Sequence, residues 1–432
     1  MPTLEQTLAE TLDASFKGFP AERAPFRVAD AGSRDLRLLR GDLPFPVALL
    51  RESAMRHNAD WIGRYVRETG VSLAPHGKTT MAPQIFDEQL RGGAWGITVA
   101  NVHQGGIAAQ AGVPRVLMAN ELASVGDARR WLALAEQFAP STFLSLVDST
   151  DQLALLERAA RDAGATARFD LLVELGAKGG RTGCRDADAA LALARAVRES
   201  PHARLAGVEA YEGVVTNGDS DHDRPLVAAW MQTLATLARA CDAHGLFEGD
   251  EVVVSAGGSA VFDLVTDALA GVALSRPARV VLRSGCYITH DHGTYVRAMK
   301  SVAARGLSAT ARSGPMRGAL EVWGAVQSRP EPELAIVTMG KRDVSFDVDL
   351  PVPILWFRPG EHTVPQPAPA HWRITRLMDQ HAFLPLRADD GLRVGDWLAV
   401  GISHPCTTFD KWRLIWAVDD DYRVTRAIRT YF

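Results

Sequence analysis

Short apolar segments alternate with helical segments from about residue 70 to residue 285, and this alternation constrains the fold more than any other feature. The apolar segments are rich in β-branched residues, and the stretches between them carry Ala and Leu at helical spacing. Eight strand candidates occur, at 71–75, 95–100, 115–120, 142–147, 169–175, 204–211, 251–256 and 278–285. Repeated strand–helix units form parallel sheets, and eight of them are typical of a closed (β/α)8 TIM-type barrel. A doubly wound open sheet is the alternative, although no GxGxxG follows the first strand.

The pattern changes after about residue 300. Segments such as LEVWGAVQS, VPILWFRP and DWLAVGIS are short and aromatic, and Gly, Pro and Asp separate them. This texture is typical of a mostly antiparallel β domain. A ninth strand candidate, LPFPVALL at 43–50, precedes the barrel and is a candidate for the same domain. We therefore expect four parts: an N-terminal extension (1–42), a lead-in segment (43–70), the barrel (71–300) and a C-terminal β domain (301–432).

Composition excludes several classes of protein. The 432 residues carry a net charge of -4 and no basic run, so a nucleic-acid-binding surface is not expected. Four cysteines without a CxxC pair favour a reduced, cytoplasmic protein. The N-terminus has acidic residues and lacks the apolar core of a signal peptide, and no uncharged apolar run could cross a membrane. We expect a partner that is a small molecule.

Lys78 stands directly after the first barrel strand, in the segment PHGKT. Catalytic groups of barrel enzymes lie at the carboxyl ends of the strands. A lysine in that position can be desolvated, and its amine then becomes a nucleophile toward a carbonyl group. The alternative is a surface lysine in a loop, because most lysines are exposed.

Two turns of small residues follow the seventh and eighth strands. The first, SAGGSAVFD, begins at Ser255, and the second contains Ser284 and Gly285. Free backbone N–H groups in such turns bind anions, and barrels often bind phosphate between these two loops. Either turn alone is an ordinary turn. Both turns together with Lys78 are the set that a phosphate-bearing aldehyde such as pyridoxal phosphate would need.

Three other segments carry candidate residues. Arg181 lies in a Gly-rich loop after the fifth strand, and Tyr211 ends the sixth strand, although a solvated arginine and a capping tyrosine are the alternatives. His404 and Cys406 are two residues apart, so their side chains would face the same way in an extended segment. Imidazole and thiolate together suit zinc, and two protein ligands leave room for water or substrate. A loop histidine beside a buried cysteine is the alternative.

The order of these motifs is PHxKT, a Gly-rich arginine loop, a tyrosine, a small-residue loop and HxC. In this order they resemble fold-type III pyridoxal-phosphate enzymes, whose N-terminal barrel is of the alanine racemase type. The similarity is to the D-serine dehydratase / D-threonine aldolase group and extends over roughly residues 43–432. The chain departs from that group where KTHK is replaced by KTTM, and where the loop before Arg181 is longer.

The resemblance implies a role for each candidate. Lys78 would bind pyridoxal phosphate covalently, and Arg181 and Tyr211 would approach its ring. Five residues would surround the phosphate: Ser255, Gly257, Gly258, Ser259 and Tyr287. His404 and Cys406 would hold a divalent metal, for which their nitrogen and sulfur donors favour zinc. The resemblance also implies a homodimer with its sites near the subunit interface.

The implied activity is that of a metal-dependent lyase acting on D-3-hydroxy amino acids. The HxC form resembles the dehydratases, and HxD is associated with the aldolases. Dehydration of D-serine or D-threonine to a 2-oxo acid and ammonia is therefore the first expectation. D-threonine aldolase activity, which would give glycine and an aldehyde, is the alternative. An amino-acid racemase and a non-catalytic pyridoxal-phosphate carrier are two further alternatives.

Overall fold

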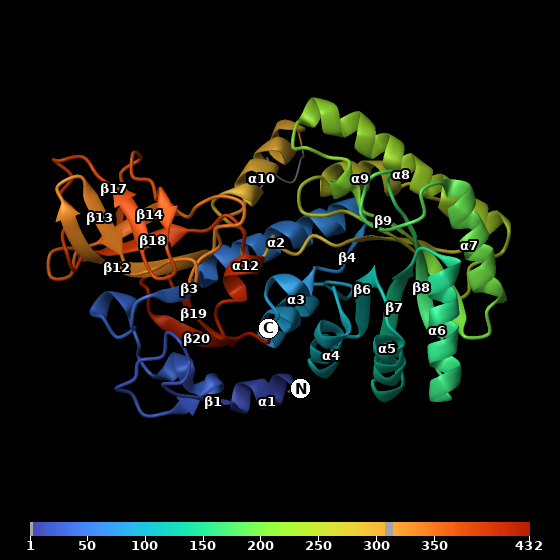
Figure 1. Cartoon of the computed structure of the whole chain (residues 1–432), viewed down its shortest axis with the longest axis horizontal. Coiled ribbons are helices and arrows are strands. Elements are labelled where there is room, and N and C mark those ends of the chain that lie inside the picture. Colours follow the sequence, from blue (N-terminus) through green and yellow to red (C-terminus); the bar gives the residue numbers. More distant parts are fainter. Residues whose placement is uncertain (1–2, 307–313) are drawn as a thin grey trace.

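The computed structural model describes residues 3–306 and 314–432, and its two large sheets lie beside each other (Figure 1). One sheet consists of eight parallel strands in the order β4-β11-β10-β9-β8-β7-β6-β5. The strands are β4 (Ser72–Leu73), β5 (Ile97–Val99), β6 (Arg115–Glu121), β7 (Thr142–Val147), β8 (Phe169–Leu175), β9 (Ala203–Ala210), β10 (Val252–Ala256) and β11 (Ala278–Leu282). All eight strands predicted from the alternating pattern are confirmed.

The eight-stranded sheet curls until its edge strands β4 and β5 meet. The amide of Trp95 donates to the carbonyl of Leu73 at 2.7 Å, and the amide of Thr98 donates to that of Pro75 at 2.9 Å. An isolated parallel bridge joins His76 to Thr98. The predicted barrel-type fold is therefore confirmed, and the seam at β4 and β5 is its least regular part. This curling brings the carboxyl ends of the eight strands together at one mouth.

Helices connect the strands and cover the outside of the sheet (Figure 1). They are α3 (Pro83–Arg91), α4 (Val102–Gln110), α5 (Val125–Gln137), α6 (Thr150–Ala163), α7 (Ala187–Glu199), α8 (Ser220–Ala243), α9 (Phe262–Leu269) and α10 (Thr294–Ala304). Local sequence explains their ends: the Ser149 hydroxyl accepts from the amide of Gln152 at the start of α6, and Gly164 ends that helix with φ +59°. In the part of the chain that is described, no helix combines the length and apolar character needed to span a bilayer.

The second sheet, here called the β domain, contains the C-terminal strands. They are β12 (Leu320–Glu331), β13 (Leu334–Val337), β14 (Val352–Phe357), β15 (Gln366–Pro367), β16 (Arg376–Leu377), β17 (Ala382–Pro385), β18 (Trp397–Gly401), β19 (Leu414–Val418) and β20 (Val424–Arg429). The ninth predicted strand, β3 (Val47–Arg51), pairs antiparallel with β12 and parallel with β19. Helix α2 (Glu52–Thr69) then leads from β3 to β4. The chain therefore passes through the β domain before it enters the barrel.

Residues 3–42, here called the N-terminal arm, pack on the β domain. The arm contains α1 (Leu4–Ala9), β1 (Thr11–Leu12), β2 (Phe26–Arg27) and the 3-10 turns Val28–Ser33 and Leu38–Arg40. The rings of Phe19 and Phe26 lie 6.5 and 6.4 Å from that of Trp416 in β19. The indole N–H of Trp416 donates to the carbonyl of Gly18 at 2.9 Å. The arm thus completes the apolar core on one face of the β domain.

Candidate active site

A cavity of about 480 Å³ lies at the barrel mouth, and both parts of the molecule contribute to its wall. Lys78, Arg181 and Tyr211 line it from the barrel. His404 and Cys406 line it from the β domain. With Gly258 and Ser259, seven of the ten candidates named from sequence are therefore brought into one cavity, from positions up to 328 residues apart (406 minus 78).

Lys78 lies in a single 3-10 turn, Gly77–Thr79, that follows β4. The turn is held at both ends: the amide of His76 donates to the carbonyl of Arg283 at 3.2 Å, and the amide of Tyr431 donates to that of Met81 at 2.9 Å. Among the residues that the structure describes, none forms a hydrogen bond or ion pair with the Lys78 amine. A fixed backbone therefore presents a free amine to the cavity, which is the requirement for bonding to a carbonyl group.

Two side chains of the cavity wall carry buried polar atoms without a partner in the described part of the chain. They are Nδ1 of His76 and Oε2 of Glu209. Burial, together with the positive charges of Lys78 and Arg283, lowers the pKa of His76 well below its ordinary value, so this imidazole is neutral. Buried polar atoms are normally hydrogen-bonded, so these two are available to a bound polar ligand.

The buried pair of Glu209 and Arg283 was not foreseen from the sequence. A guanidinium nitrogen of Arg283 lies 2.5 Å from Oε1 of Glu209. Burial raises the pKa of Glu209 to about 8, and Arg283 opposes this rise. The two residues come from β9 and from the end of β11, and no local motif marks them. Only the strand order, which places β9 and β11 on either side of β10, brings them together.

The two predicted phosphate turns meet at one side of the cavity. Gly258, Ser259, Gly285 and Cys286 line it there. The amides of Gly257 and Gly258 donate to the Glu212 carboxylate at 3.0 and 2.5 Å, so an anion already accepts from two amides of the first turn. A Cβ atom at Gly285 would lie 2.5 Å from the carbonyl oxygen of His76, so the close approach of the second turn to the lysine turn requires glycine.

Ser255, Gly257 and Tyr287 do not line the cavity, whereas Gly258 and Ser259, the other two residues predicted around the phosphate, do. The Ser255 hydroxyl donates to the carbonyl of Val281 at 3.1 Å and accepts from Arg283 at 2.8 Å, inside the sheet. Tyr287 faces a separate small pocket, which it shares with Leu73 and Gln89. The turn after β11 directs Cys286 inward and the next side chain outward, and the spacing of residues in the sequence does not reveal this.

Arg181 and Tyr211 lie together at the mouth. The guanidinium carbon of Arg181 is 5.2 Å from the centre of the Tyr211 ring, close enough for a cation–π contact. Burial raises the pKa of Tyr211, and the neighbouring Glu212 carboxylate adds to this rise. Although the Gly-rich loop is long, it still carries Arg181 to the cavity.

His404 and Cys406 form the candidate metal site, but their segment is not extended as predicted. Pro405 has helical angles and Cys406 begins the short helix α12 (Cys406–Phe409), so the chain turns between the two side chains. Nδ1 of His404 lies 2.6 Å from Oδ2 of Asp347. A carboxylate bonded to one ring nitrogen leaves the other for a metal, an arrangement that orients histidine ligands. Asp347 has no sequence motif and was missed.

The charges at this site also suit a metal. Hydrogen bonding from Cys286, His404 and Thr79 lowers the pKa of the Cys406 thiol well below its ordinary value. The hydrogen bond to Cys406, supported by Asp347, raises the pKa of His404 to about 9. Both shifts favour the charged form of each side chain, and a divalent cation bound by the two would replace a proton. The donors fit a borderline-soft metal.

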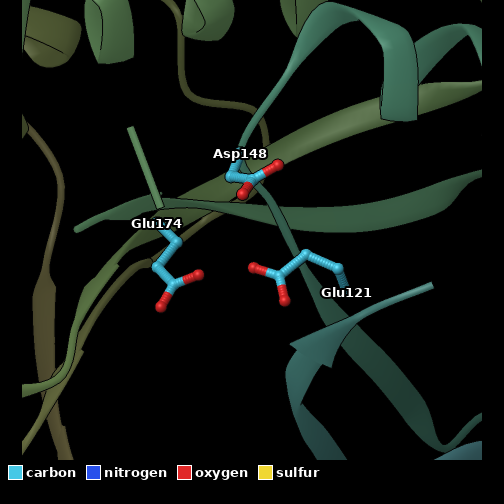
Figure 2. Close-up of side chains that lie close together, drawn as sticks. All are labelled: Glu121, Asp148 and Glu174. Carbon is cyan, nitrogen blue, oxygen red and sulfur yellow. The ribbon is translucent and has the colours of Figure 1, made fainter. Parts of the chain in front are cut away.

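Three carboxyl groups gather beside the cavity at the ends of neighbouring strands (Figure 2). The oxygens of Glu121, Asp148 and Glu174 lie within 4.8 Å of one another. Burial and a hydrogen bond with Glu174 raise the pKa of Glu121 to about 9, so this carboxyl keeps its proton at neutral pH. The hydroxyl of Thr182 donates to Glu174 at 2.9 Å, and the amide of Gly183 donates to Asp148 at 3.1 Å. The cluster thereby anchors the loop that carries Arg181.

The cavity fits pyridoxal phosphate on several independent grounds. It offers a free amine at Lys78 and two buried polar atoms without a partner, on His76 and Glu209. The amides of Gly257 and Gly258, by contrast, already donate to the Glu212 carboxylate. His404 and Cys406 offer nitrogen and sulfur donors to a metal at the same cavity. These features together can bind an amino acid, bond to its nitrogen through a cofactor aldehyde, and place a cation beside it.

Comparison with known proteins gives two family matches. Residues 50–297 match "Alanine racemase, N-terminal domain", and residues 319–418 match "Putative serine dehydratase domain". The chain is 29% identical over 383 residues to a D-threonine aldolase from Arthrobacter sp, covering 83% of this chain and 90% of that protein. It is 26% identical over 316 residues to a 3-hydroxy-D-aspartate aldolase from Paracoccus denitrificans (strain Pd 1222), covering 72% and 75% respectively.

Solved structures share the same fold. A D-threonine aldolase from Filomicrobium marinum superposes with a TM-score of 0.75 at 24% identity, covering 94% of this chain and 98% of that one. A D-threo-3-hydroxyaspartate dehydratase from Delftia sp. HT23 superposes with a TM-score of 0.70 at 22% identity, covering 91% and 99%. One variant of a dehydratase of that name, with a TM-score of 0.71 at 21% identity, covering 92% and 99%, is described as a metal-free form.

The first family model matches 248 residues (50 to 297), which is more than half of the 432-residue chain. The barrel, the lysine turn and the second domain agree with that match. The chain therefore belongs to the alanine racemase N-terminal domain family, and its second domain, of the serine dehydratase type, places it among the pyridoxal-phosphate lyases related to D-threonine aldolases and D-hydroxyaspartate dehydratases.

Proposed function

We propose that this protein is a metal-dependent lyase that cleaves the Cα–Cβ bond of D-3-hydroxy amino acids, with D-threonine as a representative substrate. One observation carries the proposal: a single cavity joins Lys78 from the barrel to His404 and Cys406 from the β domain. A carrier or a racemase does not need a metal site beside the lysine, whereas a lyase that acts at a β-hydroxyl group does need one.

The residues of the cavity have separate roles in this reaction. Bound pyridoxal phosphate supplies an electron sink for the pair of electrons left at Cα. A divalent cation on His404 and Cys406 supplies a positive charge that lowers the pKa of the substrate hydroxyl. Lys78 would hold the cofactor through Nζ and would hold or return a proton at that atom. Arg181 and Tyr211 orient the cofactor ring.

The chemistry of cleavage balances without a further reactant. The substrate hydroxyl loses its proton and becomes a carbonyl as the Cα–Cβ bond breaks. The bonding electrons pass to Cα, and a proton added there gives glycine; the other product is acetaldehyde when the substrate is D-threonine. The reaction needs only a positive charge near the hydroxyl and a group near Cα that carries a proton. His404 and Cys406, which would hold the cation, suit the first task, and Lys78 suits the second.

Dehydration is the second candidate, and Cys406 favours it. The HxC form led the sequence analysis to expect loss of water, but both curated relatives carry aldolase names. Those names support carbon–carbon cleavage as the first proposal. The two reactions begin from the same bound substrate. Dehydration breaks the Cα–H and Cβ–O bonds, whereas carbon–carbon cleavage breaks the O–H and Cα–Cβ bonds.

Product analysis with D-threonine separates the two reactions. Purified protein supplied with pyridoxal phosphate and zinc should release glycine and acetaldehyde, and a chelator should stop the release. Lys78→Ala should be inactive, whereas Lys300→Ala, which changes an exposed lysine on α10, should match the unaltered protein. Ammonia and 2-oxobutyrate would instead establish the dehydratase. Racemised threonine, or no product at all, would contradict both lyase readings.

A further inference from the structure

Cys286 and Cys406 are 120 residues apart in the chain, yet their sulfur atoms lie 4.0 Å apart in the cavity. Cys286 follows β11 of the barrel, and Cys406 begins α12 of the β domain. Both are free thiols, and their separation is nearly twice the ~2.05 Å of a disulfide bond. Both line the same cavity as Lys78 and His404. The cavity wall therefore includes two thiols together with the imidazoles of His76 and His404.

The separation of the two sulfur atoms matches that of two thiolates on one zinc ion. Zinc–sulfur bonds of about 2.3 Å at a tetrahedral angle place two sulfurs roughly 3.8 Å apart. The observed 4.0 Å differs from this value by only about 0.2 Å, the tolerance expected of a preformed metal site. Without a metal, the two thiols share one weak partner: the Thr79 hydroxyl lies 3.3 Å from Cys406 Sγ and 3.8 Å from Cys286 Sγ.

We propose that Cys286 is a third protein ligand, beside His404 and Cys406, of a zinc ion bound in this cavity. The inference rests on the proposed metal-dependent function and extends it by one residue. Two cysteines and one histidine form a ligand set used by catalytic zinc, with a fourth position left for water or substrate. The substrate hydroxyl would take that position.

The third ligand has two consequences for the molecule. A site with two thiolates binds zinc in preference to magnesium or manganese, because hard cations prefer oxygen donors. The zinc ion would also join the β11 loop of the barrel to α12 of the β domain. Cys286 adjoins Gly285 in the second predicted phosphate turn, so metal and cofactor sites would share one short segment.

Cobalt substitution tests the proposal, because the intensity of sulfur-to-cobalt charge-transfer absorbance counts bound thiolates. The unaltered protein should show the intensity of two thiolates, and Cys286→Ser and Cys406→Ser should each fall to about half. Cys241→Ala, which changes a cysteine buried in α8, is the matched control and should keep full intensity. Zinc affinity, measured by competition with a chromophoric chelator, should weaken in Cys286→Ser by more than the 10–100-fold typical of outer-shell changes.

A second measurement needs no variant and covers the case in which Cys286→Ser folds poorly. Alkylation of the native protein, followed by peptide mass spectrometry, should modify Cys286 faster without zinc than with it. A bound metal with single-thiolate intensity, and equal alkylation of Cys286 with and without zinc, would overturn this inference and leave the proposed function standing. Failure of the unaltered protein to bind zinc or cobalt would overturn both.

Discussion

At the scale of single residues, the site depends on side chains that touch the candidate ligands rather than on those ligands alone. Asp347 contacts His404 at 2.6 Å and accepts from the Thr407 hydroxyl at 2.8 Å. It therefore fixes which imidazole nitrogen faces the cavity. Such carboxylates orient metal ligands and raise their basicity.

Replacement of Asp347 by Asn should weaken metal binding by about 10–100-fold, because the imidazole loses its orienting charge. Zinc affinity measured by chelator competition checks this expectation. Asp349→Asn is the matched control: Asp349 is two residues away and pairs with Arg297 at 2.7 Å instead. Equal affinities in both variants would show that Asp347 has no part in holding the metal.

Among single residues, the sequence predicted those that belong to a local motif. Lys78, Arg181, Tyr211, Ser259, His404 and Cys406 all line the cavity. Residues defined only by contact could not be predicted. Cys286 meets Cys406 across 120 positions, and Asp347 meets His404 across 57. No spacing rule joins such pairs, because side-chain packing between two domains brings them together.

At the scale of elements, the carboxyl ends of β6, β7 and β8 place three acidic groups against one another. Glu121 keeps its proton in the folded protein, where its pKa is about 9, but loses it near the ordinary value of 4.5 in the unfolded chain. The folded state therefore binds more protons between these two values. Its stability falls as pH rises through that window.

Glu121→Gln should remove this dependence, since the amide is neutral at every pH and keeps the size of the side chain. The variant should melt at a higher temperature than the unaltered protein, and the difference should grow from about pH 5 to about pH 8. Calorimetry at several pH values measures it. Glu22→Gln, which changes an exposed residue of the N-terminal arm, should show no pH-dependent difference in melting temperature. A pH-independent difference at Glu121 would mean that the carboxyl is ionised when folded.

Secondary-structure elements were easier to predict from the sequence than contacts between distant segments. All eight barrel strands follow from their apolar runs, and β3 was recognised as a strand outside the barrel. The packing of the N-terminal arm could not be predicted, because its contacts are with β19, close to 400 residues later. The irregular seam between β4 and β5 could not be predicted either, because the pattern of apolar residues does not show how two such short strands pair.

At the scale of the whole molecule, the two ends of the chain support the lysine turn. Tyr431 donates its amide to Met81, and its hydroxyl lies 3.0 Å from that of Thr7 in the arm. Arg429 pairs with Glu10 at 2.8 Å. The barrel, the β domain and the arm therefore meet near Lys78. A destabilising change in the arm should lower the free energy of unfolding of the whole molecule.

Phe19→Ala should lower the free energy of unfolding by about 3–5 kcal/mol, the usual cost of removing a buried phenylalanine ring. Phe19 is buried against Trp416, whereas Phe432, at the C-terminus, is half exposed. Phe432→Ala is therefore the control and should change stability little. Denaturant unfolding followed by tryptophan fluorescence measures both variants. Similar stabilities for the two would show that the arm does not contribute to the core.

Reductive trapping is a direct test of whether the free amine at the barrel mouth bonds to pyridoxal phosphate, as proposed. The native protein is incubated with pyridoxal phosphate, reduced with borohydride, digested and analysed by mass spectrometry. The peptide that contains Lys78 should carry a pyridoxyl group, and Lys78→Ala should yield no such adduct. An adduct on a different lysine, or bound cofactor that leaves every lysine unmodified, would contradict this proposal.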